Sequence, residues 1–356
     1  MTNYTIPTVK ELKAQTESND HRFEVVSLFA GGGGSSTGYR MAGGKVLAVN
    51  EFIPEAQKTY ASNWETTHIF DCDVRKLTPE EILAKINKKK YELDILDGSP
   101  PCSAFSTAGS RNKGWGKVKK YSDSQQKNVE DLFFEYIRIL RGIMPKAFVA
   151  ENVSGLAKGV AKGYLNEIIR ELKASGYHVV CKVLNAKFLG VPQSRNRVIF
   201  VGVRNDIWKE SMSNKTHPAP FDYIATLKDA FKGLVFTNQD KLETDLSKYK
   251  VYSLLKSTPV GKSHDKAFTL AKASPDGASP CIKATTGKIG ARESYHWDNR
   301  AFTVSEIKRI MSVPDDYVLT GTYQQKVERL GRMVPPLMMK AIAENIYREI
   351  LQHADT

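Results

Sequence analysis

The amino-acid sequence predicts an α/β fold, in which a doubly wound and mostly parallel sheet carries a smaller inserted lobe. Three observations lead to this prediction. Short β-branched runs alternate with helical segments up to about residue 205, a glycine-rich loop follows the first run directly, and the alternation then stops until a final amphipathic helix. Strands that alternate with helices pair in parallel, and helices cover both faces of such a sheet.

Composition narrows the class of protein. The 356 residues are 41% hydrophobic, and 52 Lys and Arg against 39 Asp and Glu give a formal charge of +13, which favours a polyanionic partner without being specific for one. No apolar run reaches the roughly 18 residues of a membrane span, and the N-terminal segment MTNYTIPTVKELKAQTESND has no signal-like apolar core, so we expect a cytoplasmic protein. The four cysteines form no CxxC pair, which argues against a disulfide framework and a zinc knuckle.

The first strand is expected over residues 23–29, directly before the glycine loop AGGGGSSTG and a helix. Glycine takes the left-handed backbone angles of such a tight loop without steric cost. A second strand over 45–50 leads to Glu51, which lies 20 residues after Gly31. A βαβ nucleotide site places an acid on ribose hydroxyls at this spacing, although a glycine loop alone is a weak sign of one.

The other elements follow in order. We expect strands over residues 91–98, 146–153, 178–185 and 197–204, and helices over 129–143 and 163–176. After residue 205 the chain becomes rich in Lys, Ser, Thr and Pro, which favours irregular or β structure with no helix of any length before about residue 305. The segment VPPLMMKAIAENIYREILQ is a strongly amphipathic helix that we expect to return to the first lobe.

Reactive side chains follow four of these strands, at the edge where a parallel sheet binds its ligand. They are the glycine loop with Glu51, the turn from Asp97 to Cys102, the pair Glu151 and Asn152, and the set Gln193, Arg195 and Arg197. In LDGSPPCSAFSTAG two prolines stiffen a turn that presents Cys102 just past a strand end, where reactive groups are displayed. Each feature alone has an ordinary explanation, as a packing thiol, a solvated acid or surface charge. Their convergence favours catalysis.

In order and spacing, the segments FAGGGGSSTGYRMAGG, VNE, CDVRKL, DGSPPCSAFS, AENV, QSRNR and RLGRMVPP resemble the motifs of the C5-cytosine DNA methyltransferases. The resemblance covers roughly residues 24–204 and 296–350. It implies a Rossmann-like, S-adenosylmethionine-dependent catalytic domain over 1–205 plus 290–356, and a target recognition domain over 206–289.

The resemblance also implies residue roles. Cys102 would add to C6 of cytosine and so make C5 nucleophilic, while protonated Glu151 donates to N3. Arg197 would hold O2, and Arg195 would hold a phosphate or position the loop. No metal is expected. S-adenosylmethionine would be bound, with Glu51 on its ribose and Asp73 on its adenine, by Phe29, Gly31, Gly33, Glu51, Phe52, Asp73, Val74, Asp97, Ser99, Arg332 and Val334.

The substrate implied is double-stranded DNA with the target cytosine flipped out, since no reacting atom is reachable inside a stacked duplex. Segment 109–127, with five lysines and Trp115, either closes over the DNA or is a solvated loop. Other members of the family use the matching loop as a lid. A monomer is the family default, and the lack of a regulatory extension indicates a bacterial or phage enzyme, serving a restriction system or phage self-protection.

Two positions depart from the family. Ser103 stands where the family usually has Gln, although some members also have Ser there. Arg332 stands where the family has an Asn that lies beside the methyl donor. Three explanations remain open for Arg332. It pairs with a local acid such as Glu328, it weakens methyl transfer, or it matches the extra carboxylate of carboxy-S-adenosylmethionine, so that a carboxymethyl group reaches C5.

Other functions fit the sequence less well. A tRNA cytosine-5 methyltransferase shares the scaffold, but a distinct lobe of about 80 residues favours DNA. A non-catalytic DNA-binding homologue would need none of Cys102, Glu151 and Arg197. A zinc cytosine deaminase is excluded because PCSAF lacks its second cysteine, and a dehydrogenase would leave Cys102 idle.

Overall fold

A computed structural model describes residues 4–17, 20–101, 119–120, 125–126, 131–159, 161–267, 269–290 and 293–354. Cys102 and nearly all of segment 109–127 lie outside the described residues. The chain divides into two compact units. The sheet unit comprises Leu12–Leu184, Asn196–Ala219 and Met339–Thr356, and the second unit comprises Met1–Glu11, Asn185–Arg195 and Pro220–Met338.

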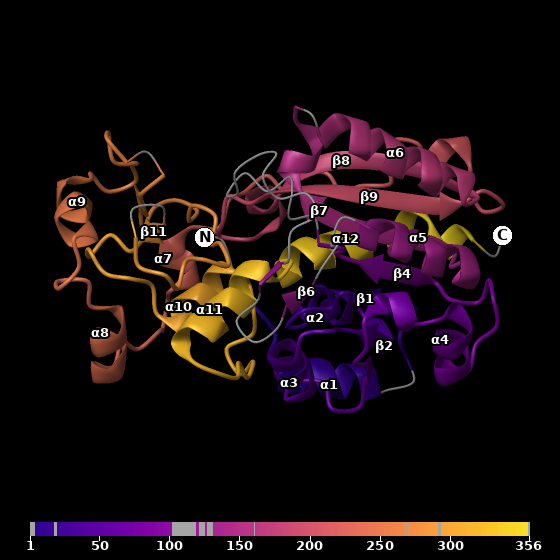
Figure 1. Ribbon diagram of the computed structural model, residues 1–356, viewed down its shortest axis with the longest axis horizontal. Coiled ribbons are helices and arrows are strands. Elements are labelled where there is room, and N and C mark those ends of the chain that lie inside the picture. Colours follow the sequence, from indigo (N-terminus) through magenta and orange to yellow (C-terminus); the bar gives the residue numbers. More distant parts are fainter. Residues whose placement is uncertain are drawn as a thin grey trace. The chain divides into compact units, whose positions relative to one another are not determined.

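The sheet unit contains a seven-stranded sheet with the strand order β3-β2-β1-β4-β7-β9-β8 (Figure 1). The strands are β1 (Phe23–Leu28), β2 (Gly44–Asn50), β3 (His68–Phe70), β4 (Ile95–Gly98), β7 (Ala147–Val153), β8 (Tyr177–Asn185) and β9 (Asn196–Arg204). All pairs from β3 to β7 are parallel, and β9 runs antiparallel to β7. The predicted mostly parallel sheet is therefore confirmed.

The main helices of this unit are α2 (Gly34–Met41), α3 (Pro54–Ala61), α4 (Pro79–Ile86), α5 (Leu132–Ile143) and α6 (Ala161–Ala174). Buried aromatic rings fill the core between α5 and the sheet, where Tyr136 lies edge-on to Phe148, which in turn meets Tyr177. The sequence did not predict α3, α4 or β3. A pair of two-residue strands, β5 (Lys119–Lys120) and β6 (Gln125–Gln126), is antiparallel.

The first and last helices, α1 (Val9–Glu17) and α12 (Pro336–Glu349), each contribute residues to both units. The sequence did not predict α1. The later residues of α12 belong to the sheet unit, where the Tyr347 ring lies 5.9 Å from that of Phe23 in β1. The predicted return of the last helix is confirmed. None of the helices in the described ranges is long and apolar enough to cross a membrane.

The second unit consists of short helices joined by irregular segments. It contains α7 (Leu227–Ala230), α8 (Asn238–Thr244), α9 (Val251–Ser257), α10 (Val304–Ile310), α11 (Tyr323–Arg332), and the paired strands β10 (Ala271–Lys272) and β11 (Ser294–Tyr295). The expectation of no helix before residue 305 is wrong. α7 and α8 begin at capping boxes built on Thr226 and Thr237, so local caps define helices too short to show a periodic pattern.

The chain passes from one unit to the other after residues 11, 184, 195, 219 and 338, while the domain limits 205/206 and 289/290 stay a prediction. Residues 206–219 belong to the sheet unit, where His217 Nε2 lies 3.0 Å from the Ile199 carbonyl of β9. Residues 290–338 belong to the second unit, because β11 pairs with β10 and the Ala301 N–H donates to the Thr244 carbonyl. Contacts across long sequence separations, which composition does not reveal, set these boundaries.

Candidate active site

The glycine loop lies between β1 and α2, and an acid from the end of β2 supports it. Glu51 is 6% exposed, and its carboxylate accepts the Gly31 N–H at 2.6 Å and the Ile53 N–H at 2.7 Å. Phe29, Gly31 and Gly33 all have positive φ, of 56°, 57° and 89°. The loop therefore needs glycine at two positions, and Glu51 holds it from the neighbouring strand.

Three further predicted donor-site residues follow β2 and β3. Phe52 is half-buried between Glu51 and α3, and Val74 is buried. Asp73 caps the short 3₁₀ helix Val74–Lys76, where its carboxylate accepts the Arg75 N–H at 3.1 Å and pairs with the Arg75 guanidinium at 3.0 Å. The structure thus brings Asp73 and Glu51 to the same edge of the sheet, because β2 and β3 are neighbouring parallel strands.

Asp97 lies inside the unit at the end of β4. Its carboxylate is 1% exposed and accepts the Ser27 hydroxyl of β1 at 2.5 Å and the Tyr39 hydroxyl of α2 at 3.2 Å. Burial raises the pKa of Asp97 to about 7; the Ser27 and Tyr39 hydrogen bonds lower it, and the nearby charge of Glu151 raises it. Neither Ser27 nor Tyr39 was predicted from the sequence; a serine inside the apolar run FEVVSLF was the available signal.

The described chain reaches the start of the predicted cysteine turn. The Ser99 N–H donates to the Leu28 carbonyl at 3.4 Å, and the Asn152 amide donates to the Pro100 carbonyl at 3.1 Å. These bonds tie the residues just before Cys102 to β1 and to β7. Gly98 is required here, because a Cβ atom would lie 2.6 Å from the Tyr136 ring of α5.

Glu151 and Arg197 form a pair across the antiparallel strands β7 and β9. Arg197 Nε lies 2.6 Å from Glu151 Oε1, and the side chains are 13% and 11% exposed. The other Glu151 oxygen makes no hydrogen bond to any residue that the structure describes. The arrangement offers one carboxyl oxygen and one guanidinium, side by side, to a planar polar ligand.

Arg195 and Gln193 are buried in the second unit. The Arg195 guanidinium is 2% exposed and donates to three main-chain carbonyls, those of Ile282 at 2.9 Å, Gly331 at 3.0 Å and Met333 at 3.1 Å. The Gln193 side chain accepts the Ile282 N–H at 3.0 Å. Arg195 thus connects two segments of its own unit.

Arg332 and Val334 also belong to the second unit. The Arg332 guanidinium pairs with Glu328, one turn earlier in α11, with Nη2 to Oε1 at 2.9 Å. Val334 is buried, being 4% exposed. Of the three explanations for Arg332, the observed contact is the local ion pair. Across the described ranges, no cluster of three or more His, Cys, Asp or Glu could hold a metal ion.

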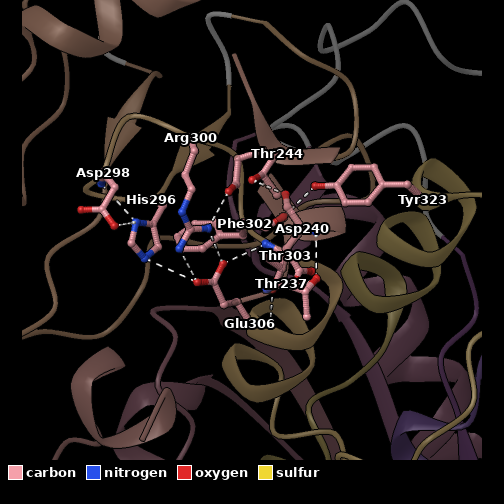
Figure 2. Close-up of polar contacts among 11 residues, drawn as sticks. Thr237, Asp240, Thr244, His296, Asp298, Arg300, Phe302, Thr303, Glu306 and Tyr323 are labelled. Carbon is pink, nitrogen blue, oxygen red and sulfur yellow. Dashed lines mark hydrogen bonds and ion pairs between the residues drawn. The ribbon is translucent and has the colours of Figure 1, made fainter. Parts of the chain in front are cut away.

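A second arginine–glutamate pair lies in the second unit, and the sequence analysis did not single it out. Arg300 binds Glu306 through two contacts of 2.6 Å and 2.8 Å, and the Thr303 N–H donates to the same carboxylate at 2.8 Å (Figure 2). His296 Nε2 lies 3.5 Å from Glu306. Burial lowers the pKa of His296 to about 3, so the imidazole is neutral at pH 7.

The same cluster joins several elements of the second unit. Figure 2 shows the Tyr323 hydroxyl of α11 directed at the Phe302 carbonyl, where it donates at 2.7 Å. The Thr244 hydroxyl donates to the Asp240 carbonyl within α8, and the Thr244 carbonyl accepts the Ala301 N–H. The cluster is therefore a structural junction of α8, α10 and α11.

Comparisons with known proteins give a consistent result. The family model described as "C-5 cytosine-specific DNA methylase" matches residues 23–348. The chain is 36% identical over 348 residues to the Type II methyltransferase M.FnuDI of Fusobacterium nucleatum, covering 91% of this chain and 94% of that protein. It is 30% identical over 338 residues to the Type II methyltransferase M1.HphI of Haemophilus parahaemolyticus, covering 91% and 86%.

Solved structures show the same fold. A putative DNA modification methyltransferase encoded within an E. coli prophage aligns with a TM-score of 0.72 at 20% identity, covering 93% of this chain and 99% of that chain. A DNMT2 mutant from Spodoptera frugiperda aligns with a TM-score of 0.66 at 19% identity, covering 91% and 99%. At these identities the likeness concerns the fold.

Proposed function

This chain belongs to the family of C-5 cytosine-specific DNA methylases, and from that membership we propose how its residues carry out the reaction. It is an S-adenosylmethionine-dependent DNA cytosine-5 methyltransferase of the Type II kind. The observation that carries the residue-level proposal is the Glu151–Arg197 pair, beside the Asn152–Pro100 bond that anchors the turn leading to Cys102.

The glycine loop fits S-adenosylmethionine. A Cβ atom built on Gly31 would meet nothing within 4 Å, so the loop faces open space, while Glu51 lies below it. We propose that Glu51 binds the ribose hydroxyls and Asp73 the adenine amine, with Phe29, Gly33 and the other predicted residues of the sheet unit around them. When bound, S-adenosylmethionine supplies an electrophilic methyl group.

The protein residues prepare cytosine for that methyl group. The Cys102 thiolate forms a bond to C6, and the electron pair of the C5–C6 double bond makes C5 nucleophilic. Protonated Glu151 donates to N3 and Arg197 donates to O2, so both draw charge out of the ring as the thiolate adds. After C5 is methylated, a base removes its proton and the Cys102 thiolate leaves, which restores the double bond.

The substrate in this proposal is a cytosine flipped out of double-stranded DNA, with residues 206–289 as the target recognition domain. Their position in the chain, after β9 and before α12, supports that role. We assign Arg195 the positioning role rather than the phosphate contact, because its guanidinium is buried and already bound to three carbonyls. Lysine-rich segment 109–127, with Trp115, would close over the DNA.

The proposal also concerns which compound donates the group that reaches C5. We expect ordinary S-adenosylmethionine, because the ion pair with Glu328 offsets the positive charge of Arg332. The competing donor is carboxy-S-adenosylmethionine, which a guanidinium in place of the usual Asn favours. A carboxymethyl product that falls on Arg332→Asn would establish that alternative.

The test is a mass measurement of nucleosides. The purified chain is incubated with DNA and each donor separately, and with tRNA in parallel, and the digested nucleosides are weighed. We expect 5-methylcytosine from DNA with S-adenosylmethionine, and none from Cys102→Ala. Modified tRNA without modified DNA would identify RNA as the substrate. The absence of modified cytosine in several DNAs would instead favour the hypothesis of a non-catalytic DNA-binding homologue.

A further inference from the structure

Asp97 is a buried acid that belongs to neither the glycine loop nor the Glu151–Arg197 pair. The guanidinium of Arg197 offsets the charge of Glu151, whereas the partners of Asp97 are neutral donors, the hydroxyls of Ser27 and Tyr39 and the Gly98 N–H. A carboxyl with this surrounding is costly to bury when ionised. Such a cost in a strand that leads to a nucleophile indicates a role beyond packing.

The geometry favours the ionised form of Asp97. The two hydroxyls meet different carboxylate oxygens, and the Ser27 contact of 2.5 Å is in the range of a charge-assisted O–H···O⁻ bond. Both hydroxyls can donate to a carboxylate, but a protonated Asp97 must itself donate to one of them. Protonation therefore reverses or breaks one of these two bonds.

Asp97 joins the two halves of the proposed site. Ser27 lies two residues before Phe29, at the entry to the glycine loop, and Tyr39 lies on the helix that leaves this loop. Asp97 itself precedes the turn to Cys102. The carboxylate thus links the structure around the donor loop to the strand that carries the nucleophile.

We propose that Asp97 is a positioning residue whose ionised carboxylate fixes β1 and α2, on either side of the glycine loop, to the end of β4 and favours a cationic methyl donor over the neutral product. This inference rests on the proposed function. The donor carries a sulfonium charge and its demethylated product, S-adenosylhomocysteine, does not. Methyl transfer to C5 requires that sulfur beside a base held by Cys102, and a buried negative charge acts over several ångströms where water is excluded.

Protonation of Asp97 should then remove the preference for the cation. The titratable groups around it are Tyr39 of α2, Tyr136 of α5 and Glu151 of β7, the last paired with Arg197. Burial raises the pKa of both tyrosines well above 10, so neither changes charge near neutral pH. With the pKa of Asp97 raised to about 7, the carboxyl is neutral well below pH 7 and ionised above it.

The experiment measures equilibrium binding of S-adenosylmethionine and S-adenosylhomocysteine to the full chain by calorimetry, from pH 5.5 to 8. We expect Asp97→Asn to weaken binding of the sulfonium by roughly tenfold at pH 8 and that of the thioether by no more than about twofold. In the wild type, the preference for the sulfonium should rise as pH passes through 7. In Asp97→Asn it should follow only the titration of the ligands, which is common to all variants.

Two matched variants separate charge from structure. Asp94→Asn changes the acid just before β4, which accepts the Glu24 N–H at 2.9 Å and pairs with Lys146 at 3.3 Å, and should leave the affinity ratio unchanged. Ser27→Ala removes one hydrogen bond but keeps the Asp97 charge, so it should lower methyl transfer while the preference persists. If Asp97→Asn fails to fold, Ser27→Ala should still shift the wild-type pH dependence upward, because a lost donor disfavours ionised Asp97.

A wild-type affinity ratio in Asp97→Asn, with an unchanged pH dependence, would overturn the inference. So would an unshifted pH dependence in Ser27→Ala. Failure of the proposed function looks different, since the wild type would then produce no modified cytosine in DNA, whichever of the two compounds it binds.

Discussion

The two arginine–glutamate pairs of this molecule share a shortest contact of 2.6 Å, but they are built differently. In the second unit, Glu306 meets Arg300 through both oxygens and also accepts the Thr303 N–H. In the sheet unit, Glu151 uses one oxygen toward Arg197. A carboxylate whose oxygens are all engaged by protein groups stabilises the fold and has no acceptor site left for a ligand. One with capacity left can bind a ligand, so exposure and distance alone do not separate structural pairs from pairs that can bind a ligand.

The same substitution in both pairs tests whether Glu151 and Glu306 differ in role, and the largest effect is expected for Glu151→Gln. An amide cannot supply the proton that N3 needs, so methyl transfer should fall by about 10²–10⁴-fold, the usual range for losing a general acid. The melting temperature should fall less than in Glu306→Gln, because only one oxygen of Glu151 contacts Arg197. Initial rates with radiolabelled donor, beside a thermal melt, test this. A variant with more than a tenth of wild-type activity would rule out the assigned role.

Glu306→Gln should give the reverse result. It leaves the Arg300 guanidinium without its buried partner, which costs about 3–5 kcal/mol of the free energy of unfolding. Activity per folded molecule, measured well below the melting temperature, should stay within about twofold, since this pair touches no reacting atom in our proposal. Urea titration followed by circular dichroism measures the loss. Unchanged stability would show that filled capacity does not mark a structural pair.

Asp97 extends the comparison of Glu151 and Glu306, because it is a buried acid that is not paired with an arginine. Its pKa is raised from 3.8 to about 7, so the folded chain binds the proton more tightly than the unfolded chain. Its stabilising contribution is therefore full below pH 4 and is lost as pH rises through 7, by roughly 4 kcal/mol at most. Asp97→Asn should flatten this part of the stability profile in urea titrations at pH 5 and pH 8, whereas Asp94→Asn should not.

The smallest effect is expected for Arg332→Asn. The pair with Glu328 is a half-exposed i, i+4 contact on α11, with side chains 31% and 15% exposed, so its loss should cost no more than about 0.5 kcal/mol. Methyl transfer from S-adenosylmethionine should remain within about twofold of wild type. A rise of tenfold or more in methyl transfer would instead mean that Arg332 acts at the donor.

The sequence predicted the parts of the fold that local patterns encode. β1, β2, β7, β8 and β9 are apolar runs bounded by turn residues, and the glycine loop follows β1 as expected. The short helices α7 to α9 carry too few residues for a periodic pattern to emerge. For the site, the strand-end residues were predictable, because parallel strands bring their carboxyl ends to one edge.

Partners that are distant in sequence were not predictable. Asp97 meets Ser27, 70 positions away, because β1 and β4 are neighbours in the sheet with these two residues in register. Arg195 and Arg197 alternate in the sequence, which is a pattern typical of surface charge. The Arg195 guanidinium is nevertheless buried and bound to carbonyls of residues more than 80 positions later. Strand order and the path of the chain through the second unit determine such contacts. Neither can be predicted from the local patterns of a single sequence.

The end of β4 also restricts how this chain can evolve. Asp97 is held on one face of the strand by Ser27 and Tyr39, and Gly98 faces the Tyr136 ring with no room for a methyl group. Drift at either position needs a simultaneous change in β1, α2 or α5. A saturation library over residues 95–101 should therefore lose nearly all function at these two positions, and function should return only when a second library varies β1, α2 or α5 as well.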